Sequence, residues 1–182
     1  AKIGFTGSLE DFFAFMRTDK RFFLPNDDAG RAQYLKLAEG YLAGMKAKLP
    51  TVFGRLPKAD LIVKRVESFR EEPGGAAHYS SGAPDGSRPG IFYVHLADTA
   101  ATPTFELEGT CYHEGWPGHH MQIMLAQEMT GLPKFRGQYN YGAYVEGWGL
   151  YAELLAKEMG FYQDPYSDFG RLGREIWRGI RL

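Results

Sequence analysis

The sequence is poor in cysteine, in long apolar runs and in any surplus of one charge sign, and each shortage excludes a class of protein. Cys111 is the only cysteine, so no disulfide can form within the chain. No run approaches the ~20 apolar residues that a membrane-spanning helix needs, so no membrane span is expected. Lysine and arginine number 21 against 22 acidic residues. Without a basic surplus to neutralise phosphates, nucleic acid is not an expected partner.

What the sequence does have is the composition of a globular protein and strong helical periodicity. Hydrophobic residues make up 44% of the 182 residues, which suits one ordinary domain. Ser8 before an acidic turn is typical of a helix N-cap, whereas short β-branched runs predict strands and Gly, Pro and Ser predict a loop over 71–90. The predicted fold class is therefore mainly α (α+β), with a small antiparallel sheet that includes an edge strand. Helices are expected at 8–18, 27–48, 102–115, 118–130, 141–160 and from 164, and strands at 60–68 and 90–98.

Both ends of the sequence lack the features of natural termini. The chain opens without an initiator Met, and its last residues, "REIWRGIRL", keep an amphipathic pattern with no helix cap. We therefore expect residues 1–182 to form a single domain that is the catalytic segment of a longer helical protein. Localisation signals would then lie elsewhere, which leaves the cytoplasm and the periplasm both open.

The segment "CYHEGWPGHH" at 111–120 is the strongest functional signal. The usual zinc-peptidase motif is H-E-x-x-H, with both histidines on one helix face. Here His113 and His119 are six residues apart, which in an unbroken helix means about 9 Å along the axis. Zn–N bonds of about 2.0–2.1 Å cannot bridge that separation. Pro117 and Gly118 supply a helix break, so we expect the chain to bend there and bring the two rings together.

The spacing leaves open which histidine returns to the metal. If the segment is treated as H-E-x-G-H with two extra residues, His119 is the ligand. His120 is then an alternative ligand, or a group that contacts a ligand or the substrate. Three histidines within eight residues, beside Glu114, favour a metal site over histidines on a surface turn.

A third ligand is expected from the helix at 141–160. Glu146 lies in "YVEGWGLYAE" on the side predicted to face inward, and the neighbouring Gly147 and Gly149 leave room for a close neighbour. Glu153 stands two turns later. It could pair with Lys157 on the surface, or supply the carboxylate that orients a ligating histidine.

The remaining acidic group of the motif is Glu114. Beside a ligand histidine, it is placed to take a proton from zinc-bound water and pass it to a leaving amine. One zinc ion held by His113, His119 and Glu146 would lower the pKa of that water toward ~7. The sequence therefore predicts zinc-dependent hydrolysis of peptide bonds, with short peptides as substrates and Glu114 as general base.

Three blocks together carry a family resemblance: "PDGSRPGIFYVHL", "HEGWPGHHMQ" and "YVEGWGLYAE". Their combination resembles the bacterial family catalogued as domain of unknown function 885. That family is itself similar to the mostly helical gluzincin peptidases, such as the angiotensin-converting-enzyme-like and thimet-like oligopeptidases. The resemblance implies a zincin-like helical fold, zinc at His113, His119 and Glu146, and Glu114 as the base. It also implies oxyanion-stabilising groups beyond Leu182, so the segment alone is expected to bind metal and hydrolyse little.

The same resemblance suggests substrate contacts. Related enzymes bind an extended peptide along an edge strand above the metal, which would give the strand at 90–98 that role. Tyr93 and His95 share one face of this strand, where they either contact substrate or pack on the core. Arg88 either binds a substrate carboxylate or stabilises its own loop.

Two other functions fit the same ligands. The first is a non-enzymatic helical module with a structural metal site, for which His120 would be the fourth protein ligand. The second is a zinc amidase or esterase that acts on a non-peptide substrate. Substrate length, exo- or endo-action and oligomeric state are left open by the sequence.

Overall fold

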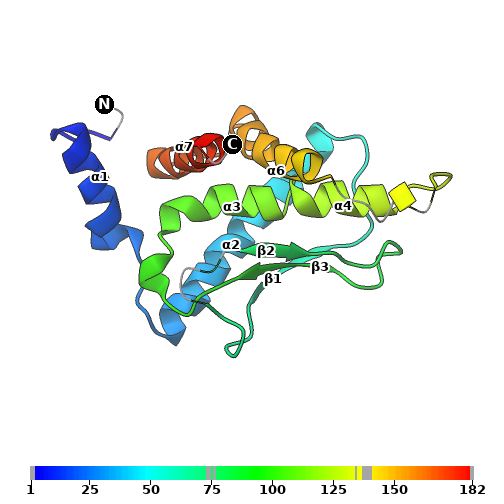
Figure 1. Ribbon diagram of the computed structural model, residues 1–182, viewed down its shortest axis with the longest axis horizontal. Helices are drawn as coiled ribbons and strands as arrows, with labels where there is room; N and C mark the ends of the chain where they lie inside the picture. Colours follow the sequence, from blue (N-terminus) through cyan, green and yellow to red (C-terminus); the bar gives the residue numbers. More distant parts are fainter. Residues whose placement is uncertain (1–2, 73–74, 76, 134, 137–140, 181–182) are drawn as a thin grey trace.

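The computed structural model describes residues 3–72, 75, 77–133, 135–136 and 141–180. Among these residues helices dominate and the sheet has three short strands, so the predicted mainly α (α+β) class is confirmed (Figure 1). The α-helices are α1 (Leu9–Thr18), α2 (Asp28–Lys48), α3 (Leu107–Glu114), α4 (His119–Gln127), α6 (Gly142–Glu158) and α7 (Pro165–Ile180). The strands are β1 (Leu61–Arg65), β2 (His78–Ser80) and β3 (Gly90–Val94), and short 3-10 turns cover Lys20–Phe22, Leu49–Thr51, Thr99–Ala101 and Thr104–Glu106.

Local signals explain where the first helices begin. Ser8 and Asp11 form a reciprocal capping box at the start of α1, so two otherwise unpaired backbone groups are satisfied there. Asp27 caps α2 by accepting a hydrogen bond from the Gly30 amide at 2.8 Å. The helix bounds therefore follow the sequence prediction within a few residues.

The helices α3 and α4 run end to end through the middle of the molecule (Figure 1). The sheet lies on one side of this pair, α6 and α7 lie on the other, and α2 crosses behind. A buried core joins these layers, and Cys111 within it is fully buried. Its other members include Ala38, Met45, Phe92, Leu107, Tyr112 and Ala156.

The sheet differs from the prediction in three ways. Its order is β1-β3-β2, with β1 parallel and β2 antiparallel to β3, so it is mixed rather than antiparallel. The strand β2 lies inside the segment 71–90, which was predicted to be a loop. A strand of only three residues, surrounded by Gly, Pro and Ser, has too short a pattern to be recognised in the sequence. The strand β3 is central instead of an edge, so its backbone groups pair with both neighbours. It therefore cannot bind a substrate by main-chain pairing.

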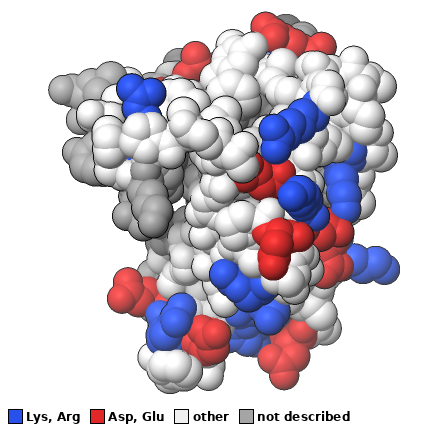
Figure 2. All heavy atoms as spheres, turned by 90° about the vertical axis from the view of Figure 1, so that its right-hand side faces the viewer, with Lys and Arg blue, Asp and Glu red and all other residues white. Residues whose placement is uncertain are grey.

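The described helices and the face drawn in Figure 2 bear on two expectations from the sequence, the absence of a membrane span and the balanced charge. None of the described helices combines the length and apolar character needed to cross a bilayer. Figure 2, viewed from the right-hand side of Figure 1, shows basic and acidic side chains interspersed over that face. This mixture agrees with the net charge of −1.

Candidate metal centre

The break between α3 and α4 lies where Pro117 and Gly118 predict it. The helix α3 ends at Glu114, a cis peptide joins Trp116 to Pro117, and α4 begins at His119. A Cβ on Gly118 would lie 1.9 Å from the carbonyl oxygen of His113, so only glycine fits at this position. The predicted change of backbone path is confirmed.

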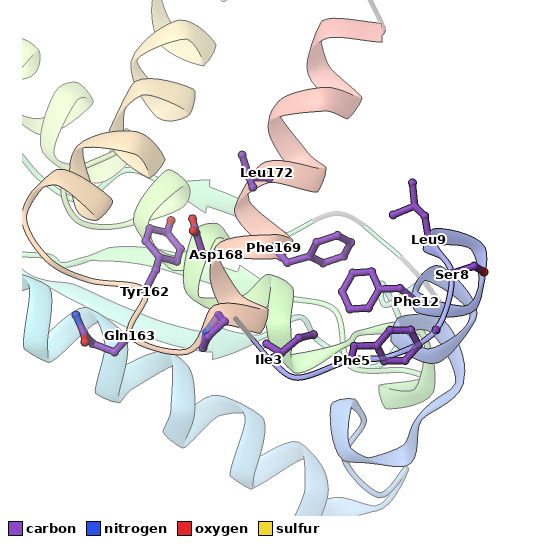
Figure 3. A pocket seen from close by; sticks show the side chains of 12 residues that line it. Ile3, Phe5, Ser8, Leu9, Phe12, Tyr162, Gln163, Asp168, Phe169 and Leu172 are labelled. Carbon is purple, nitrogen blue, oxygen red and sulfur yellow. The ribbon is translucent and has the colours of Figure 1, made fainter. Parts of the chain in front are cut away.

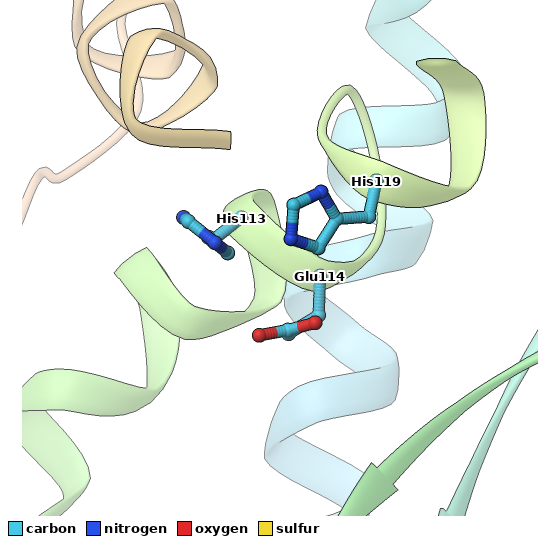
Figure 4. A group of neighbouring side chains, drawn as sticks. All are labelled: His113, Glu114 and His119. Atoms are coloured by element: carbon cyan, nitrogen blue, oxygen red, sulfur yellow. The ribbon is translucent and has the colours of Figure 1, made fainter. Parts of the chain in front are cut away.

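The bend brings the motif side chains together. The ring centroids of His113 and His119 are 4.6 Å apart, against the ~9 Å rise of six residues in a straight helix. His113, Glu114 and His119 each offer a ligand atom within 4.8 Å of the others, and all three residues are buried. Figure 4 shows the two rings and the carboxylate gathered around the bend.

Glu146 reaches this cluster from α6. Its Oε2 lies 3.4 Å from His113 Nε2, and its Oε1 lies 3.5 Å from His119 Nε2. Gly149 permits the approach of α6, because a Cβ there would lie 2.5 Å from His113 Cε1. Gly147 has open space around it, so it is not needed for this contact. The Trp148 indole donates to the Pro117 carbonyl at 2.9 Å, which fastens α6 to the bend itself.

Glu153 orients the first histidine. Its Oε1 lies 2.8 Å from His113 Nδ1, and both side chains are 1% exposed. The carboxylate can only accept, so Nδ1 carries the proton and Nε2 keeps its lone pair. Lys157 pairs with Asp168 instead of Glu153. The position of Glu153 is therefore that of the carboxylate behind a ligating histidine.

His120 points away from the cluster, and both of its ring nitrogens are engaged. Nε2 donates to the Ala59 carbonyl at 3.1 Å, so Nδ1 accepts from the Tyr79 hydroxyl at 3.0 Å. The ring is fully buried between α4 and the sheet. Of the two histidines that the sequence left open, only His119 faces the other ligand candidates.

The three residues proposed for substrate contact lie outside the cluster. Arg88 donates to the carbonyls of Ser81 and Gly82, which is the loop-stabilising alternative. His95 Nδ1 accepts from the Glu72 amide at 3.2 Å. Tyr93 stacks on a neighbouring histidine ring of β2. None of these contacts connects the residues to His113 or His119.

Two arginines of α7 that contact the cluster were not predicted from the sequence. Arg178 Nη1 donates to Glu146 Oε2 at 2.7 Å, and its Nη2 lies 3.1 Å from His113 Nε2. Arg174 lies 3.4 Å from Glu153 and donates to Thr110 at 3.0 Å. The only sequence signal is two arginines one helical turn apart in "REIWRGIRL", which does not say what they contact.

Burial and these charges set the protonation of the cluster. Burial raises the pKa of Glu114 to about 8. Burial, reinforced by the neighbouring His113, lowers the pKa of His119 to about 4. Burial acts to raise the pKa of Glu146, but the hydrogen bond from Arg178 helps to hold it below its usual value. At neutral pH the cluster therefore offers a neutral imidazole at His119 and a carboxylate at Glu146, the forms that bind metals.

The donor set fits a zinc ion. Two imidazoles and one carboxylate are the protein ligands of one class of catalytic zinc site, in which water or substrate takes the fourth position. The cation that already contacts this set is the Arg178 guanidinium, which touches His113 Nε2 and Glu146 Oε2. A site whose free donor atoms attract a side-chain cation is suited to a metal cation.

A separate cavity of about 700 Å³ lies between the start of the chain and α7 (Figure 3). Its walls are mostly apolar and include Phe5, Phe12 and Phe169, and it shares no lining residue with the metal cluster. Asp168 at its rim is paired with Lys157 and Arg171. The cavity therefore offers mainly apolar side chains. The histidines and carboxyl groups of the candidate metal centre lie at the α3–α4 bend instead.

The chain belongs to the family described as "Bacterial protein of unknown function (DUF885)", whose model matches residues 1–182. Its structure is similar to the crystal structure of a protein described as "the putative lipoprotein from Colwellia psychrerythraea". The two share 37% sequence identity with a TM-score of 0.90 over 97% of this chain. This chain spans 30% of that longer one. No curated protein matches it.

Proposed function

We propose that this chain carries the catalytic centre of a zinc-dependent peptidase of the gluzincin type. The observation that supports this is the convergence of His113, Glu114, His119 and Glu146 at one buried bend. Three separate features of the fold produce it: the break at Gly118, the glycine at position 149 and the carboxylate behind His113. A site assembled with this many constraints is more than a chance cluster of polar side chains.

In this proposal each side chain has one role. His113, His119 and Glu146 would hold the metal, and Glu153 fixes the ring of His113 in the tautomer that leaves Nε2 free. Bound zinc would polarise a carbonyl and lower the pKa of water to ~7. Burial raises the pKa of Glu114 to about 8, and the positive charge of bound zinc would offset this and favour the carboxylate. Glu114, whose ligand atom lies within 4.8 Å of those of both histidines, would then accept the proton of the attacking water. It then returns that proton to the amine that leaves.

The structural-metal alternative needs a fourth protein ligand, and His120 was its candidate. Because both nitrogens of His120 are held by Ala59 and Tyr79, that ring is not available to complete a closed site. The three remaining ligands leave a position for water, which is the pattern of catalytic zinc. Peptides are the proposed substrates because the gluzincin-like motif is that of peptidases.

The experiment is a Glu114→Gln substitution in the full natural polypeptide, with zinc content and peptide cleavage measured on the same samples. The variant should keep one zinc per chain and lose about 10²–10⁴-fold in cleavage rate, since that is the contribution of a general base. Glu158→Gln, an exposed glutamate at the end of α6, is the matched control and should cleave like wild type. Cleavage by Glu114→Gln at the wild-type rate would remove the proposed base.

A further inference from the structure

The Arg178 guanidinium contacts Glu146 Oε2 and His113 Nε2, two atoms that would coordinate the proposed metal. One nitrogen donates to Glu146 Oε2 at 2.7 Å, and the other lies 3.1 Å from His113 Nε2. The planar fork of arginine suits such a two-point contact. Arg178 therefore bridges the α3 ligand and the α6 ligand from a third element, α7.

The His113 contact is exclusive. His113 Nδ1–H is committed to Glu153, so Nε2 has one lone pair to offer. An arginine N–H and a metal ion cannot both take that lone pair. When a metal coordinates Nε2, the guanidinium must leave this atom.

The charges of the cluster explain why an arginine is there. The carboxylates of Glu146 and Glu153 both lie against His113, and that of Glu153 is buried. Uncompensated buried charge is costly. Without a metal, positive charge at the ligand atoms comes from Arg178, while Arg174 serves Glu153 on the far side of His113.

We propose that Arg178 competes with a metal cation for His113 Nε2 and Glu146, because its guanidinium contacts the same two atoms. The guanidinium bridges His113 and Glu146, and it must leave His113 Nε2 when a metal binds there. Its side chain is 31% exposed, so the described residues do not enclose it. The inference rests on the metal-binding part of the proposed function and is independent of hydrolysis.

The test measures zinc affinity by competition with a chromophoric chelator, for wild type, Arg178→Gln, Arg178→Lys and Arg70→Gln in the full natural polypeptide. Arg178→Gln should bind zinc about tenfold or more tightly, because a charge-assisted hydrogen bond no longer opposes the metal. Arg178→Lys keeps the charge but lacks the fork, so its affinity should fall in between. Arg70→Gln, whose arginine pairs with Glu67 on the surface, should match wild type.

A second readout is thermal unfolding with chelator and with excess zinc. Arg178→Gln should melt below wild type in chelator, and zinc should raise its midpoint by more than it raises that of wild type. Equal zinc affinity in wild type and Arg178→Gln would overturn the competition. A wild-type protein that binds zinc and cleaves no peptide would end the proposed function and leave this inference standing.

Discussion

The two halves of the candidate metal centre are built differently. The inner half comes from α3 and α4, where His113 and His119 are 1% and 6% exposed and the backbone path itself sets their positions. The outer half comes from α6 and α7, where Glu146 and Arg178 are part-exposed and held by side-chain hydrogen bonds. Packing therefore fixes the side-chain positions of the inner half, whereas charged hydrogen bonds hold those of the outer half.

This difference predicts that stability and metal affinity separate across the site. Changes to the inner half should disturb the core and so lower the free energy of unfolding even without metal. Changes to the outer half should alter metal binding and leave the core intact. Three substitutions test this, in order of their expected effect on unfolding in the presence of chelator.

Gly118→Ala should have the largest effect. Its Cβ would lie 1.9 Å from the His113 carbonyl oxygen and 2.4 Å from that of Tyr112, and backbone atoms cannot swing aside as a side chain can. We expect a loss of about 3 kcal/mol, at the upper end of overpacking costs, together with loss of zinc binding. Urea denaturation in chelator measures the first effect, and chelator competition measures the second.

The matched control is Gly40→Ala in the middle of α2, where a new Cβ meets nothing within 4 Å. That variant should be as stable as wild type or slightly more stable, because alanine favours helices over glycine. A Gly118→Ala protein with wild-type stability would show that the bend is not fixed by packing. The proposed difference between the inner and outer halves would then be wrong.

Gly149→Ala should have an intermediate effect, because it acts where the two halves touch. The added Cβ would lie 2.5 Å from His113 Cε1, and that ring cannot turn away without breaking its bond to Glu153. We expect a loss of about 2 kcal/mol in the free energy of unfolding and weaker zinc binding, measured by the same two assays. Gly147→Ala, two residues earlier on α6 with open space around it, should change neither quantity for the worse. Equal behaviour of the two variants would contradict the close approach of α6.

The sequence predicted the inner half well because its signals are local. Pro117 and Gly118 break the helix for reasons that hold in any context, and six-residue spacing then requires a bend if both rings are to meet. Glu146 was predicted from a motif on a helix whose bounds are clear. The sequence left His119 and His120 open, because the ring that faces His113 depends on the direction in which the chain resumes at α4.

Other features depend on how distant elements pack, and the sequence could not give them. Arg178 reaches the cluster only because α7 folds back over α3, so its contacts are invisible in "REIWRGIRL". The central place of β3 depends on how β1 and β2 are connected to it, which strand propensity does not encode. For the same reason Tyr93 and His95 had alternatives that only the sheet order could separate.

Glu146→Gln should have the smallest effect on stability and a large effect on zinc. The side chain is 52% exposed, and its amide oxygen could still accept from Arg178, so unfolding in chelator should change by no more than about 0.5 kcal/mol. Zinc affinity should fall by more than about 100-fold, because even changes to groups behind a ligand cost 10–100-fold. The same pair of assays applies.

Glu153→Gln is the informative comparison for this last variant, because it changes a carboxylate of the same helix on the buried side. Glu153 is 1% exposed and pairs with both His113 and Arg174, so its loss of charge should lower stability in chelator more than Glu146→Gln does. If instead the two variants lose the same stability, the exposed Glu146 contributes as much to folding as the buried Glu153 on the same helix. If Glu146→Gln keeps wild-type zinc affinity, Glu146 is not a ligand, and the metal would have to be held by α3 and α4 alone.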